Sequence, residues 1–64
     1  MSTAAELGSA SSTLDQVRDR IVAAARAIEG TANEDLVIGL NEVERQLKTA
    51  SRRLERLVKE LRDR

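Results

Sequence analysis

Four acidic side chains, Glu34, Asp35, Glu42 and Glu44, are the residues whose types and spacing come nearest to a metal site. A di-iron carboxylate bundle also needs Glu-x-x-His pairs, and this chain has no histidine. Glu34 and Asp35 suit the first turn of a helix, because the positive end of the helix dipole attracts acids. Glu42 and Glu44 do not share a helix face. We therefore expect structural charges here, with no metal and no other cofactor.

The residue types that are absent restrict catalytic chemistry further. The 64 residues include no cysteine, histidine, phenylalanine, tryptophan or tyrosine. This composition excludes disulfides, thiolate or imidazole metal sites, cysteine nucleophiles and histidine bases. The sequence predicts a protein that is not an enzyme and whose core is aliphatic and thin.

A basic stripe is the second pattern that could bind a ligand. Its members recur at helical spacing near the end of the chain: Arg45, Lys48, Arg52, Lys59 and Arg62. Such a stripe could contact the phosphates of a nucleic acid. The net charge of zero and the lack of interleaved aromatic residues argue against nucleic acid. They favour a solvated helix face whose charge is partly offset by nearby acids.

An apolar heptad repeat predicts the helices on which these charged residues lie. From Glu34 to Arg64 the apolar residues recur at alternating intervals of four and three, which is typical of a coiled-coil helix. They are Leu36, Leu40, Val43, Leu47, Ala50, Leu54, Leu57 and Leu61. An earlier series repeats in the same way at Leu14, Val17, Ile21, Ala24 and Ile28, and Leu7 and Ala10 extend it backwards.

Signals that end one helix and begin another lie side by side at Gly30. A glycine directly after the last periodic residue is a common helix terminator, since it adopts positive φ freely. Thr31 and Glu34 then fit a capping box for a second helix, as Thr13 and Gln16 do for the first. Asn33 is a competing cap for the second helix, and Ser12 with Asp15 is an equally good one for the first. This pattern predicts an all-α fold, an antiparallel two-helix hairpin of coiled-coil type. The expected parts are a flexible arm rich in Ser, Ala and Gly (1–12) and a hairpin domain (13–64), with helix one at about 13–29, the connector at 30–33 and helix two at about 34–64. An extension of helix one toward Ala4 stays open.

The distribution of charge also favours a chain that doubles back. Residues 1–44 carry eight acids and three bases, whereas residues 45–64 carry eight bases and three acids. Opposite charges therefore attract if the second helix lies against the first.

Antiparallel pairing gives a specific expectation for the seam between the helices. Facing apolar residues have numbers that add to 64, as for Ile28 with Leu36 and Val17 with Leu47. The predicted intramolecular seam consists of Leu14, Val17, Ile21, Ala24, Ile28, Leu36, Leu40, Val43, Leu47 and Ala50.

A hairpin of this size has too few apolar residues to be stable alone, so more surface must be buried elsewhere. Two apolar patches, one near the connector and one at the open end, lie off the predicted seam. The predicted oligomer or partner interface is Val22, Ala25, Val37, Ile38, Leu54, Leu57, Val58 and Leu61. We expect either a homodimer that forms a four-helix bundle or a hairpin docked on another helical protein.

No segment of the sequence suggests a membrane protein. The longest apolar run, Ile21 to Ala25, is far shorter than the roughly 20 residues that span a bilayer. No basic segment followed by an apolar one marks a signal peptide. We expect a cytoplasmic protein that does not bind membranes, and secretion without a cleaved signal stays open.

The segment from Ala24 to Leu61, with its small-residue connector Gly30-Thr31-Ala32-Asn33, resembles the WXG100-type helical hairpins of actinobacterial type VII secretion systems. That resemblance implies a secreted or secretion-associated helical partner. The chain has Glu29-Gly30-Thr31 where those proteins have Trp-x-Gly, and it has no Tyr-x-x-x-Asp/Glu motif.

These patterns lead to three hypotheses about function. The first is a non-enzymatic protein-interaction module, a self-associating hairpin that serves as scaffold, adaptor or partner of a larger protein. The second is a secretion-associated hairpin that masks or escorts a helical effector. The third is a small regulator that binds nucleic acid through its basic stripe, and salt-sensitive binding would favour it.

Overall fold

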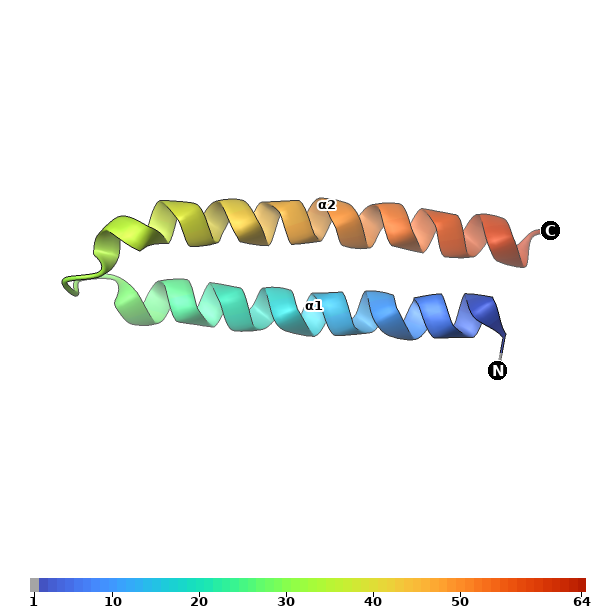
Figure 1. Ribbon diagram of the computed structural model, residues 1–64, viewed down its shortest axis with the longest axis horizontal. Coiled ribbons are helices and arrows are strands. Elements are labelled where there is room, and N and C mark those ends of the chain that lie inside the picture. Colours follow the sequence, from blue (N-terminus) through green and yellow to red (C-terminus); the bar gives the residue numbers. More distant parts are fainter. Residues whose placement is uncertain (1) are drawn as a thin grey trace.

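The computed structural model describes residues 2–64 as two antiparallel helices joined at one end (Figure 1). Helix α1 covers Thr3–Ile28, a single 3₁₀ turn η1 covers Glu34–Leu36, and helix α2 covers Val37–Arg62. The start of α1 and the end of α2 lie together at the end opposite the connector. The predicted all-α helical hairpin is confirmed.

Helix α1 begins much earlier than the sequence pattern predicts. Ser2 is the N-cap, and its hydroxyl accepts a hydrogen bond of 3.1 Å from the backbone N–H of Ala5. The prediction of a flexible arm is therefore wrong for residues 3–12, while Met1 lies outside the described residues. The capping box at Thr13 does not form, because that hydroxyl donates to the Ser9 carbonyl inside the helix.

The chain reverses direction at Gly30, which has a φ of 74°. Behind it, the Thr31 backbone N–H donates to the Ile28 carbonyl at 3.1 Å, and the Thr31 hydroxyl donates to the same oxygen at 2.6 Å. That hydroxyl also accepts from the backbone N–H of Asn33 at 3.2 Å, which replaces the capping box expected with Glu34. One threonine thus closes the turn after α1.

The helices pack in a register that differs from the predicted one. Ser11 contacts Ser51 and Arg18 contacts Glu44, and both pairs have numbers that add to 62. The same seven-residue spacing places Ala25, which is buried, level with Val37. The column of α2 that faces α1 is therefore Val37, Glu44, Ser51 and Val58.

This register corrects the predicted seam. Ala24, Leu36, Val43 and Ala50 are exposed, so they do not lie between the helices. The other predicted members are half-buried along one side of the contact: Leu14, Val17, Ile21, Ile28, Leu40 and Leu47. Small side chains lie between the helices at Ser11, Ala25 and Ser51, and they allow the two backbones to come close. The half-buried members of the predicted seam therefore lie on one side of the contact and not between the helices.

Candidate functional site

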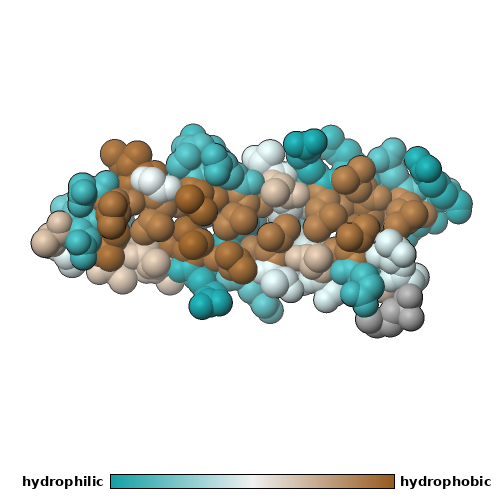
Figure 2. Space-filling model, viewed as in Figure 1, coloured by the Kyte–Doolittle hydropathy of each residue, from teal (hydrophilic) through white to brown (hydrophobic). Residues whose placement is uncertain are grey.

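An apolar face runs the length of the hairpin on one side (Figure 2). It combines the two heptad series, which lie on the same side of the seam: Leu7, Ala10, Leu14, Val17, Ile21, Ala24 and Ile28 from α1, and Leu36, Leu40, Val43, Leu47, Ala50, Leu54, Leu57 and Leu61 from α2. Four of its large side chains are exposed: Leu36 by 56%, Leu57 by 56%, Val43 by 41% and Leu61 by 39%.

The contact between the two helices buries too few hydrophobic side chains to account for all the apolar residues of the hairpin. Within residues 2–64 the buried hydrophobic side chains are Ala25 and Val58, which are 4% and 5% exposed. A continuous apolar surface of this kind normally marks a protein interface.

The residues of the two predicted interface patches do not all lie on one surface of the hairpin. Ala25 and Val58 lie between the helices, where they pack α1 on α2, so assigning them to an outer patch is wrong. Val37 is half-buried in the column of α2 that faces α1, and Val22 is half-buried beside that contact. Leu54, Leu57 and Leu61 belong to the apolar face.

Ile38 lies away from the apolar face, although it is 81% exposed. It precedes Arg45, Arg52 and Lys59 at seven-residue intervals, so it shares their side of α2. This isoleucine is therefore an exposed hydrophobic residue on the polar face, defined as the opposite side of the hairpin.

A polar network crosses the seam where the heptad pattern predicts apolar contacts. Ser51, which is 2% exposed, donates to Asp15 at 2.8 Å and lies 3.4 Å from the Ser11 hydroxyl. Arg18 forms a 3.0 Å ion pair with Glu44 and a 3.5 Å pair with Asp15. Sequence reasoning missed this network, although the shared spacing of Ser11 with Arg18 and of Glu44 with Ser51 could have indicated it.

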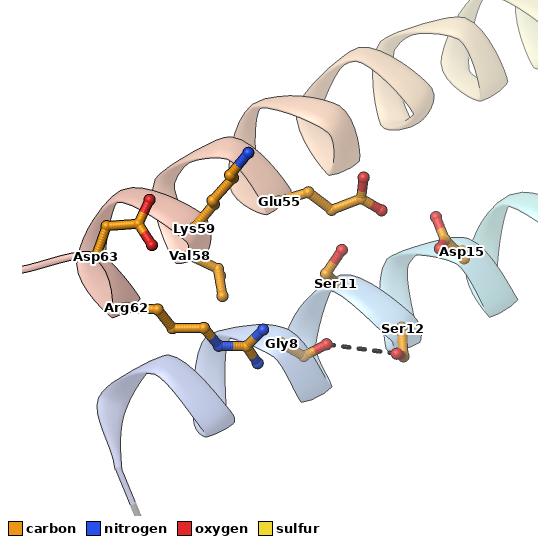
Figure 3. A pocket seen from close by; sticks show the side chains of 9 residues that line it. All are labelled: Gly8, Ser11, Ser12, Asp15, Glu55, Val58, Lys59, Arg62 and Asp63. Carbon is orange, nitrogen blue, oxygen red and sulfur yellow. Dashed lines mark hydrogen bonds between the residues drawn. The ribbon is translucent and has the colours of Figure 1, made fainter.

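The polar face carries a hollow of about 390 Å³ at the open end of the hairpin (Figure 3). It is lined by Gly8, Ser11, Ser12 and Asp15 from α1 and by Glu55, Val58, Lys59, Arg62 and Asp63 from α2. Arg62 extends over Gly8, where a Cβ atom would lie 3.7 Å from its guanidinium nitrogen. The hollow exists because small residues of α1 face long side chains of α2.

The basic stripe follows this polar face but is not uniformly positive. Lys59 and Arg62 share the hollow with three acids, Asp15, Glu55 and Asp63. At the other end of the stripe, Arg45 forms a 3.2 Å ion pair with Glu42. Lys48 and Arg52 are exposed and lie between the Arg45–Glu42 ion pair and the hollow. The polar face therefore has a mixed charge.

Glu34 and Asp35 lie in η1, and Glu44 pairs with Arg18 in the seam. Across residues 2–64, His, Cys, Asp and Glu side chains form no group of three or more that could hold a metal ion. Over the same residues, neither helix is long and apolar enough to cross a membrane.

Comparisons with protein-family models, curated proteins and solved structures find no match for this chain. The apolar face must therefore be interpreted from its own side chains. These are aliphatic and carry no group that could bind a charged ligand or transfer a proton. What such a face can do is pack against other apolar helices.

Proposed function

We propose that this chain is a protein-interaction module without enzymatic activity, which self-associates through its apolar face. Two hairpins stack these faces to form a homodimeric four-helix bundle of coiled-coil type. The observation that carries the proposal is the exposure of Leu36, Val43, Leu57 and Leu61 on one side of a hairpin whose own interior is so small. As a dimer, the module serves as scaffold or adaptor.

The size of the face supports a stable dimer. The hairpin has a total accessible surface of 5023 Å², divided mainly between its two broad sides. A standard protein interface buries about 800 Å² on each partner. One hairpin therefore presents enough surface for a specific interface.

A different helical protein is the alternative occupant of the apolar face, as the resemblance to WXG100-type hairpins suggests. In that case the chain would stay monomeric when purified alone. The mixed charge of the polar face supports no corresponding proposal for nucleic acid.

A matched pair of lysine substitutions tests the self-association. Leu57→Lys places a charge on the apolar face, whereas Ile38→Lys places the same charge at a more exposed site on the polar face. Burying an unpaired charge is costly, so we expect Leu57→Lys to weaken the dimer at least about tenfold and Ile38→Lys to leave it nearly unchanged. Sedimentation equilibrium with interference optics measures both, since the chain lacks Trp and Tyr.

Two results would contradict the proposal. One is a wild-type chain that sediments as a monomer at every concentration. The other is equal weakening of the dimer by both substitutions, because the apolar face would then have no special role.

A further inference from the structure

The order of small and large residues along the apolar face restricts how a second copy can pack on it. In the observed register, Ala10 lies level with position 52 of α2, within about half a turn of Ala50. The two alanines therefore form one shallow layer of the face, and large residues lie on both sides of it.

A parallel dimer, with both connectors at the same end, would stack this shallow layer on itself. It would place α1 of one copy on α2 of the other at equal heights, so that four alanines gathered at one level. The bundle core would then contain a hole there and crowded layers of leucine nearby. Both defects are unfavourable in a close-packed core.

An antiparallel dimer, with the connectors at opposite ends, removes both defects. It stacks α1 on α1 and α2 on α2 in reversed direction about a two-fold axis at the middle of α1, between positions 15 and 16, which is level with positions 46 and 47 of α2. Each alanine then meets a large residue of the second copy: Ala10 meets Ile21, Ala24 meets Leu7, and Ala50 meets Val43. Small and large residues alternate across the interface.

The distribution of charge favours the same arrangement independently. The half of the hairpin nearest the connector, residues 18–44, carries six acids and three bases. The open half, residues 2–17 and 45–64, carries five acids and eight bases. An antiparallel dimer places a net charge of −3 beside a net charge of +3 at both ends, whereas a parallel dimer places like charges together.

We infer that the partner of the apolar face is a second copy of this chain in antiparallel orientation, its connector lying over the open end of the first hairpin. This inference rests on the proposed self-association and adds the geometry of the dimer.

Spin-label distances separate the two orientations. The chain has no cysteine, so Asn33→Cys in the connector and Gln16→Cys near the middle of α1 each give one labelling site, and both positions are exposed. In the antiparallel dimer, labels at position 33 lie at opposite ends of a rod whose Cα atoms span 51 Å. We expect double electron–electron resonance to give a distance of roughly 50 Å there, and one of roughly 10–25 Å at position 16, about one to two helix diameters.

The label at position 16 also distinguishes failure of the inference from failure of the proposed function. Position 16 lies near the middle of the hairpin, so its labels are close in either type of dimer. A short distance at both positions would overturn the antiparallel orientation and leave the dimer intact. Absence of a short distance at position 16 would overturn both the dimer and the inference.

Discussion

At the scale of single residues, the contact between the helices depends on small and polar side chains. Ser51 is 2% exposed and bonds to Asp15, while Arg18 and Glu44 pair one heptad away. Polar residues at heptad core positions contribute less stability than apolar ones, but they can fix register because a shifted helix leaves them unpaired. The network accordingly favours the observed pairing over the pairing predicted from the leucines.

We predict that Ser51→Leu destabilises the hairpin by about 1–3 kcal/mol, because the extra side chain overfills a close contact and leaves Asp15 without its donor. Thr49→Leu is the control, since position 49 is exposed and we expect a change within about 0.5 kcal/mol. Thermal unfolding followed by far-UV circular dichroism at one protein concentration measures both. Equal effects of the two substitutions would show that position 51 is not closely packed.

Sequence alone could not determine which residues face each other. The two heptad series have identical spacing, so any antiparallel register that pairs them is self-consistent, including the predicted one. Choosing the observed register requires knowing that Ser11 and Ser51 permit closer backbone approach than Leu14 and Ala50. Hydrophobic periodicity carries no information on how closely two backbones can approach. The seam predicted from it therefore wrongly included Ala24, Leu36, Val43 and Ala50.

At the scale of the helices, residues 3–12 depend on contacts that the local sequence does not reveal. Gly8 and several serines have low helix propensity, which favours an irregular arm. In the structure, Ser2 caps this segment, and Ser11 is 5% exposed against α2. Tertiary packing overrides propensity here, whereas the end of α1 and the turn at Gly30 follow local rules and could be predicted.

Two glycines, Gly30 in the connector and Gly39 in α2, give predictions of opposite sign. Gly30 has a φ of 74°, so Gly30→Ala should destabilise the hairpin by about 1 kcal/mol. Gly39 lies inside α2, where an added Cβ would meet no atom within 4 Å, so Gly39→Ala should stabilise the hairpin by about 0.5–1 kcal/mol. Thermal unfolding of the two variants checks the signs. Stabilisation by both would contradict the role assigned to the turn at Gly30.

At the scale of the whole molecule, the hairpin is a flat layer with two unlike sides. One side is the apolar face, and the other carries the basic stripe and the hollow near Gly8. The sequence could predict the hairpin, because it follows from the heptads and from the helix signals at Gly30. The need for further burial follows from the small size of the chain and stays a prediction. The sequence could not separate the two sides, since that depends on the register.

The central claim is that the hairpin depends on covering its apolar face with a second copy. Sedimentation equilibrium and far-UV circular dichroism over one dilution series test it most directly. We predict a dimer mass at high concentration, with helicity and dimer mass falling together on dilution. A monomer that keeps full helicity at the lowest concentration would contradict the account.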